Sequence, residues 1–261
     1  MIAVVRPVPD SLARCELTHI ERTPIDIGRA RSQHSAYERA LTSLGCEVLN
    51  LPAAHDLPDS VFIEDTALVL EELAVMTRPG AESRRAETAA VAATLVPFRQ
   101  LQFLSEPATL DGGDVLRLGR TLYVGVGARS NAAGVKQLRD IVSGWSYEVE
   151  SVAVDSCLHL KSAITEVAPG IVVLNPDWVD GRTFRDHEII EVDPSEPSAA
   201  NVLRVGHGGR GGHGGNVVLC AAAYPRTNAR VSAVATVHTI DVSELAKAEG
   251  ALTCCSLIFS R

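Results

Sequence analysis

Four short segments of this chain carry side chains that could bind and attack a guanidinium group. They hold three acids (residues 59–65), an Asp-Gly-Gly-Asp turn (111–114), a histidine (159–162) and a cysteine pair (253–256). Carboxylates match the planar donors of a guanidinium, and a thiol served by an imidazole can attack its central carbon. Each segment alone has an ordinary structural explanation, but together they indicate guanidinium chemistry.

The first segment places two adjacent acids, Glu64 and Asp65, inside the apolar run 61–69. A strand end with both acids in water is one interpretation. A cation site is the other, because burying an unpaired carboxylate is costly. Asp59 adds a third acid to the same loop.

The second and third segments carry a possible acid–histidine pair. Asp111-Gly-Gly-Asp114 is typical of a tight turn that opens a strand, while Asp111 could also orient a catalytic imidazole. His159 lies between two leucines, a context more typical of a hydrogen-bonded core residue. Its functional role would be proton transfer near neutral pH.

The fourth segment contains a possible nucleophile. Cys254 and Cys255 fall in an apolar run that predicts a C-terminal strand over 252–259, which would point them to opposite faces. One would then be core and the other could face a site, where a neighbouring cation would lower its pKa. A metal-binding or redox module that also uses His207 and His213 is an alternative, although no Cys-x-x-Cys spacing supports it.

Two arginines and one glycine-rich stretch have further possible roles. Arg84 and Arg129 each precede a predicted helix, where they would be surface charges or a clamp for a substrate carboxylate. Residues 206–215 are mostly glycine and histidine. They predict a flexible hairpin loop.

The elements that must position these residues repeat along the chain. Strands near 66–70 and 73–77, a helix near 84–95 and a strand near 98–103 are followed by a similar set at 114–118, 122–126, 131–143 and 147–153. The N-terminal set is a strand (2–6), a helix (29–44) and a strand (46–51). A period of roughly fifty residues predicts about five α/β units, in which the last strand could pair with the first and close a ring. Unit 163–195 is less regular, 201–206 and 216–221 form a hairpin, and a short helix is expected at 242–248.

Composition narrows the class of protein. The 261 residues are 46% hydrophobic and 21% charged, with a formal net charge of −8. Such a balance is typical of a folded globular protein and unfavourable for nucleic acid. No apolar stretch reaches the ~20 residues of a membrane helix. We expect a single domain, 1–261, in the cytoplasm with its six cysteines reduced.

Taken in order, the segments resemble the dimethylarginine dimethylaminohydrolase family of guanidino-group-modifying enzymes. The resemblance runs nearly end to end through six stretches: residues 3–6, 57–65, 77–85, 110–116, 158–162 and 252–256. It implies a five-bladed α/β propeller of ββαβ units around a central site. It also implies hydrolysis of Nω-methylated arginines to citrulline and an amine, with no metal or cofactor.

The resemblance further implies a role for each site residue. Cys254 falls on the nucleophile, His159 on the general acid and base, and Asp111 on the acid that orients the imidazole. The implied substrate-binding positions are Leu17 (a lid residue), Asp59, Phe62, Glu64, Asp65, Arg84, Arg129, Ala248 and Glu249. The partner would be a small arginine derivative bound by a monomer or homodimer.

Loop 206–215, segment 175–200 and the pair Ala248-Glu249 depart from the family pattern. These departures bear on the alkyl group accepted more than on the reaction type. Arginine deiminase or amidinotransferase activity and a binding protein without turnover stay open as alternatives.

Overall fold

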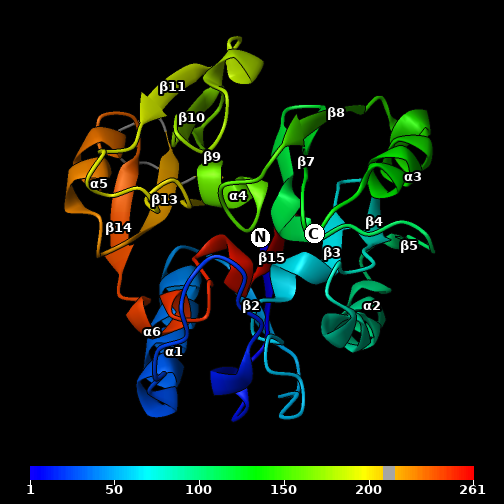
Figure 1. Ribbon diagram of the computed structural model, residues 1–261, viewed down its shortest axis with the longest axis horizontal. Coiled ribbons are helices and arrows are strands. Elements are labelled where there is room, and N and C mark those ends of the chain that lie inside the picture. The colour runs from blue at the N-terminus through cyan, green and yellow to red at the C-terminus, as the bar shows by residue number, and fades with distance from the viewer. Residues whose placement is uncertain (208–214) are drawn as a thin grey trace.

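The computed structural model describes residues 1–207 and 215–261, which build five three-stranded sheets around a common centre (Figure 1). In each sheet the second strand pairs antiparallel with the first and parallel with the third. The strands are β15–β1–β2 (Leu257–Phe259, Ile2–Val5, Glu47–Asn50), β3–β4–β5 (Ala67–Val69, Leu73–Met76, Gln100–Phe103), β6–β7–β8 (Val115–Leu118, Thr121–Val126, Glu148–Ala153), β9–β10–β11 (Ile164–Ala168, Ile171–Leu174, Glu188–Glu191) and β12–β13–β14 (Leu203–His207, Asn216–Ala221, Thr236–Ile240).

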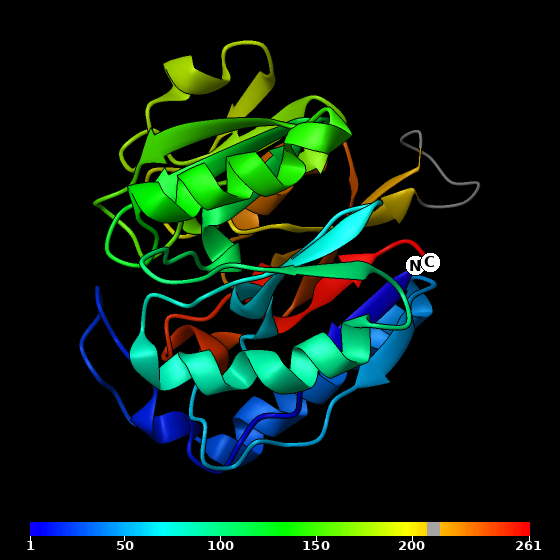
Figure 2. The ribbon, with the colours of Figure 1, turned by 90° about the vertical axis from the view of Figure 1, so that its right-hand side faces the viewer.

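Helices connect the second and third strands because parallel neighbours need a crossover. These helices are α1 (Ile27–Ser43), α2 (Thr88–Leu95), α3 (Ala132–Val142) and α5 (Pro225–Val231). Figure 2 shows α2 and α3 on the outside of the ring. The irregular fourth unit carries only a 3-10 turn, Gly181–Phe184, at this point. The predicted five-bladed α/β propeller of ββαβ units is therefore confirmed.

Sequence-local signals explain several boundaries. Asp26 caps α1 by accepting a hydrogen bond from the Arg29 backbone N–H at 2.9 Å. Gly45 follows α1 with a φ of +90°, a left-handed backbone that commonly ends a helix and that glycine adopts without strain. Gly119, with a φ of +62°, opens the two-residue turn between β6 and β7, which needs a left-handed backbone.

The two chain ends meet in one sheet, as the sequence predicted. β15 pairs antiparallel with β1, with Ile2 opposite Phe259 and Val4 opposite Leu257. The expected strand over 252–259 was wrong at its start, however, because Thr253–Cys255 form a 3-10 turn. Loop 206–215 and its His213 fall largely on residues outside the described ranges. Within those ranges, no helix is long and apolar enough to cross a membrane.

Candidate active site

The reactive segments occupy equivalent places in the repeat. A helical turn directly precedes the first strand of four units: Ile63–Thr66 before β3, Gly112–Asp114 before β6, α4 (Leu160–Ala163) before β9 and Thr253–Cys255 before β15. The first turn contacts the second and the fourth, and α4 contacts the second. First strands converge on the ring centre, so residues far apart in the sequence meet there.

His159 is held between carboxylates at this centre. Its Nε2 lies 3.0 Å from Asp111 Oδ2, and its Nδ1 lies 3.8 Å from Asp65 Oδ1. The ring is buried, and burial disfavours its charged form. The charges of Asp65 and Asp114 and the hydrogen bond to Asp111 outweigh burial and raise the pKa of His159 to about 9. The imidazole is therefore protonated at neutral pH.

Gly113 lets this arrangement form. A Cβ atom at this position would stand 2.6 Å from His159 Nδ1 and 2.8 Å from Asp65 Oδ1, closer than atoms can approach. The Gly113 N–H instead donates to Asp65 Oδ1 at 2.8 Å. The glycines of this turn therefore bring the backbone against the acid and the imidazole, a close approach that only glycine permits.

Cys254 and Cys255 have different surroundings. Cys254 is partly exposed and lines one small cavity with His159 and Asp65. Cys255 is 1% exposed and lies in the hydrophobic core, 3.4 Å from the Ala251 carbonyl oxygen. Successive residues of a 3-10 turn point about 120° apart, so the turn, rather than strand alternation, separates the two thiols.

The pKa of the Cys254 thiol was expected to fall, but it rises to about 12. Burial contributes most, and the negative charges of Glu64 and Asp65 add to it. The resting thiol is therefore protonated at neutral pH.

The raised pKa of the Cys254 thiol predicts that iodoacetamide alkylates this residue slowly at pH 7, compared with a free cysteine of pKa ≈ 8.5. The rate should keep rising with pH up to at least about pH 10. Peptide mass spectrometry at a series of pH values measures it, with Cys254→Ser as the control. Rapid alkylation at pH 7 would instead mean that the resting enzyme stabilises a thiolate.

The two adjacent acids point in different directions. Asp65 lines the cavity and pairs with Arg84. Burial opposes its charged form, but His159 and Arg84 hold the pKa of Asp65 below its usual range. Glu64 does not line the cavity. Its carboxylate accepts hydrogen bonds from Lys161 and from Thr253 Oγ1, the latter at 2.8 Å.

The two predicted carboxylate-binding arginines differ in how many donors remain free. Arg84 bonds Asp65, the carbonyl oxygen of Phe62 at 2.8 Å and Glu87 at 2.9 and 3.2 Å, so few of its N–H groups are left for a ligand. Among the residues that the structure describes, Arg129 makes one side-chain hydrogen bond, from Nη2 to Thr18 Oγ1 at 3.1 Å. Arg129 is therefore the better placed to bind a ligand carboxylate.

Most of the predicted site residues line the cavity that contains Cys254. Its lining includes Asp59, Phe62, Asp65, Arg84, Arg129, His159, Ala248, Glu249 and Cys254. Asp111 lies behind His159. Leu17 is not in the lining and packs against the core around β1 and α1. The cavity volume is about 20 Å³, room for roughly one water molecule, so the cavity is too small to hold an arginine derivative.

Asn201 and Asp114 also support the site, although no role was predicted for either residue from the sequence. Asn201 precedes the first strand of the remaining unit, and it bonds Thr253 through its amide oxygen at 3.0 Å and its amide nitrogen at 2.9 Å. Asp114 accepts from the Leu160 N–H at 3.0 Å and from Ser130 Oγ at 2.6 Å. The signal that could have found Asn201 is its place in the repeat, equivalent to the other site residues.

The same cluster contains side chains of the types that bind metal ions. Asp65, Asp111 and His159 place possible ligand atoms within 4.8 Å of one another. A cation there would have to displace the proton that these same carboxylates hold on His159. Their hydrogen bonding favours an acid–base role for the imidazole.

Comparison with known proteins decides the family. A family model described as N,N dimethylarginine dimethylhydrolase, eukaryotic, matches residues 19–259. The chain belongs to this family. Among relatives of the dimethylarginine dimethylhydrolase family, a Streptomyces coelicolor dimethylarginine dimethylaminohydrolase is 48% identical over 172 residues, 66% of this chain and 67% of that protein. The Pseudomonas aeruginosa protein of that name is 33% identical over 237 residues, 90% of each chain.

Solved structures of the dimethylarginine dimethylhydrolase family have the same fold. The Pseudomonas aeruginosa protein, as a Cys-to-Ser mutant complexed with citrulline, superposes with a TM-score of 0.91 at 32% identity over 98% of each chain. A His-to-Gly mutant carrying an adduct with S-methyl-L-thiocitrulline gives the same values. The N-terminal domain of a cyanobacterial arginine dihydrolase shares the fold at 20% identity, with a TM-score of 0.82.

Proposed function

We propose that this protein hydrolyses Nω-methylated arginines, namely asymmetric dimethylarginine and monomethylarginine, to citrulline and dimethylamine or methylamine. The observation that carries the proposal is the shared cavity of Cys254, Asp65 and the His159 that Asp111 orients. Membership of the dimethylarginine dimethylhydrolase family supports it. The apolar side chains of Phe62, Leu158 and Ala248 in the same lining suit the methyl groups.

The reaction begins with the guanidinium held against Asp65. The cation lies beside the Cys254 sulfur and lowers its pKa, so the thiol gives its proton to solvent water and the resulting thiolate attacks the central carbon. Protonated His159 gives its proton to the methylated nitrogen, dimethylamine departs, and a planar S-alkylthiouronium remains on Cys254. Neutral His159 then takes a proton from water, and the hydroxide attacks the same carbon. The carbon–sulfur bond breaks, the departing sulfur takes up the proton of the new hydroxyl group to become a thiol again, and citrulline is released.

Other residues bind the rest of the substrate. Arg129, with a smaller share from Arg84, binds the α-carboxylate, and the carboxylate of Asp59 in the same lining binds the α-amino group. Glu64 was expected to hold the guanidinium; because Lys161 and Thr253 occupy its oxygens, we assign it to positioning the Cys254 turn. The side chain of Leu17 packs against the core, so the backbone of its chain segment, rather than this side chain, covers the ligand.

We further propose that residues 1–261 act as one catalytic domain in the cytoplasm, as a monomer or homodimer, without nucleic acid or membrane. The pairing of β1 with β15 makes both ends part of one ring. Six free cysteines suit a reducing compartment. The nucleophile and the acid–base group are both side chains, so the proposed steps use no metal or organic cofactor.

Product analysis tests the proposed activity. Purified protein is incubated separately with asymmetric dimethylarginine and with arginine, and citrulline, dimethylamine and ammonia are measured. We expect citrulline and dimethylamine in equal amounts from the methylated substrate. Ammonia from arginine at a higher rate would assign the chain to arginine deiminase activity instead.

A further inference from the structure

Residues 15–22 form a strap over the catalytic cavity on the face seen in Figure 1. Glu16 contributes to the cavity lining, and its N–H donates to Asp59 Oδ2 at 3.2 Å. Thr18 accepts from Arg129 at 3.1 Å. Both partners belong to the proposed substrate site. Because the closed cavity holds roughly one water, an arginine derivative enters only if this strap moves.

The carboxylate of Glu249 binds the middle of the strap. Glu249 accepts hydrogen bonds from three successive backbone N–H groups, those of Thr18 at 2.7 Å, His19, and Ile20 at 3.0 Å. Successive N–H groups that converge in this way form an anion-binding concavity, and an ionised acceptor strengthens each bond. Glu249 also has a φ of +55°, a left-handed backbone that is unfavourable for a residue with a side chain.

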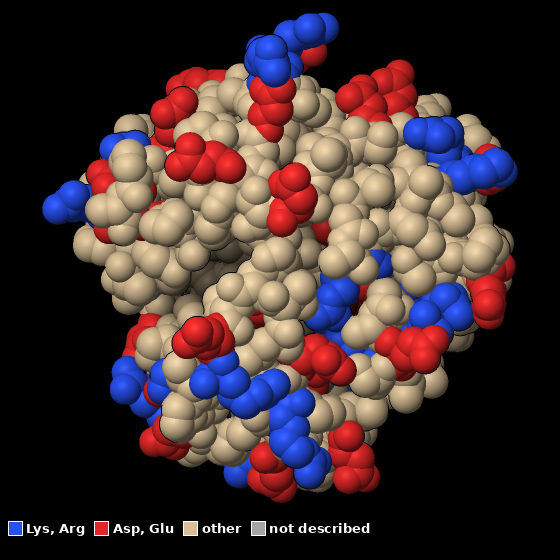
Figure 3. Space-filling view, in the orientation of Figure 1, with Lys and Arg blue, Asp and Glu red and all other residues tan. Residues whose placement is uncertain are grey.

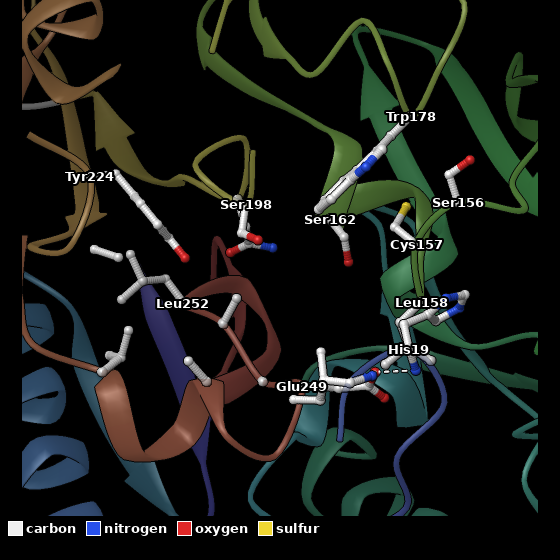
Figure 4. Close-up of a pocket in the computed structure, with 17 residues that line it drawn as sticks. His19, Ser156, Cys157, Leu158, Ser162, Trp178, Ser198, Tyr224, Glu249 and Leu252 are labelled. Carbon is white, nitrogen blue, oxygen red and sulfur yellow. Dashed lines mark hydrogen bonds between the residues drawn. The ribbon is translucent and has the colours of Figure 1, made fainter. Parts of the chain in front are cut away.

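Glu249 stands between two cavities. Leu158, Glu249 and Gly250 line both the catalytic cavity and a neighbouring cavity of about 380 Å³. In Figure 4, His19 and Glu249 meet at the floor of the larger cavity, with Trp178 and Tyr224 on its opposite sides. Figure 3 shows the hollow open on the same face of the molecule, with mostly uncharged atoms around it.

We propose that Glu249 is the positioning residue that holds residues 18–20 closed over the site, and that substrate and products pass through the larger cavity when its carboxylate releases these N–H groups. Glu249 was expected to contact substrate, but its oxygens are already bound to the strap. The inference rests on the proposed function, since it concerns passage of that enzyme's ligands. Loss of the carboxylate leaves the closed state less populated. Because the closed cavity has no room for an arginine derivative, the fraction of protein that can admit the ligand rises and KM falls in proportion.

The test compares Glu249→Gln with Glu21→Gln. Glutamine keeps the length and the backbone preference but removes the charge. Glu21 is an exposed acid in the same strap and serves as the matched control. Trypsin cleavage after Arg22, followed on ligand-free folded protein, reports strap opening without any turnover. Steady-state kinetics with asymmetric dimethylarginine separate KM from kcat.

We expect Glu249→Gln to be cleaved at least about tenfold faster than wild type and to have a KM lower by a similar factor, with kcat within about threefold, because charge-assisted bonds are lost from the closed state that excludes the ligand. Glu21→Gln should match wild type. Unchanged cleavage and KM in Glu249→Gln would overturn the proposal. If wild type forms no citrulline while Glu249→Gln is still cleaved faster, the proposed activity fails and the strap-holding role stands.

Discussion

Replacing Cys254 with serine is expected to reduce kcat by about three orders of magnitude or more. A hydroxyl ionises far less readily than a thiol. No neighbouring base is free to activate it, because three nearby carboxylates stabilise the protonated form of His159. The thiouronium intermediate then does not form. Citrulline release from asymmetric dimethylarginine measures the loss, and binding of citrulline to the mutant should persist because the cavity keeps its shape.

Cys255→Ser is the matched control, since the two residues share a turn. Cys255 faces the core, and its sulfur lies 3.4 Å from the Ala251 carbonyl oxygen, to which a serine hydroxyl can also donate. We expect turnover within about threefold of wild type and a lower melting temperature, because a polar group replaces a thiol in an apolar site. The opposite order of the two mutants would move the nucleophile to Cys255.

Asp111→Asn is expected to have the second largest effect, a loss of about three orders of magnitude in kcat. Asp111 Oδ1 accepts from the Gly80 N–H at 2.8 Å, while Oδ2 faces His159 Nε2. In the mutant the amide oxygen remains on Gly80, so the amide N–H₂ faces the imidazole and forces Nε2 to be an acceptor. The proton then sits on Nδ1, and the ring cannot act as a base toward the cavity; a similar change costs about 10⁴ in serine proteases.

Two measurements separate this tautomer effect from a folding defect. The pKa of His159, followed by NMR, should fall in Asp111→Asn, because one of the interactions that raise it is lost. Asp140→Asn, at an exposed acid of α3 that pairs with Lys136, should leave both kcat and that pKa unchanged. An unchanged histidine pKa in Asp111→Asn would contradict the orienting role of the acid.

The sequence predicted the repeat and the ring because both follow from short-range patterns. Apolar strands and capped helices recur at a steady period, and the last strand, β15, meets β1 as the period requires. Gly45 and Gly119 could likewise be placed from local backbone needs. These features depend on neighbours in the chain rather than on distant contacts.

The directions of the site side chains could not be predicted in this way. Cys254 was assigned to a strand, but it lies in a 3-10 turn whose geometry depends on Asn201 and Glu64 from other units. Glu64 and Asp65 look equivalent in the sequence. In the structure, however, Glu64 pairs with Lys161 outside the cavity lining, whereas Asp65 pairs with Arg84 beside the cavity. The direction of each side chain is therefore set by residues about 20 to 190 positions away in the sequence, and no local sequence pattern reveals it.

The attack of Cys254 on the substrate carbon can be tested most directly by mass spectrometry of His159→Gly incubated with S-methyl-L-thiocitrulline. A relative with a histidine-to-glycine substitution is known as an adduct with this compound. Its thiolate leaving group needs no general acid, while hydrolysis of the thiouronium needs the missing base. We expect a stable mass increase, with loss of methanethiol, on the peptide that contains Cys254. An unmodified Cys254, or the same increase on another residue, would contradict it.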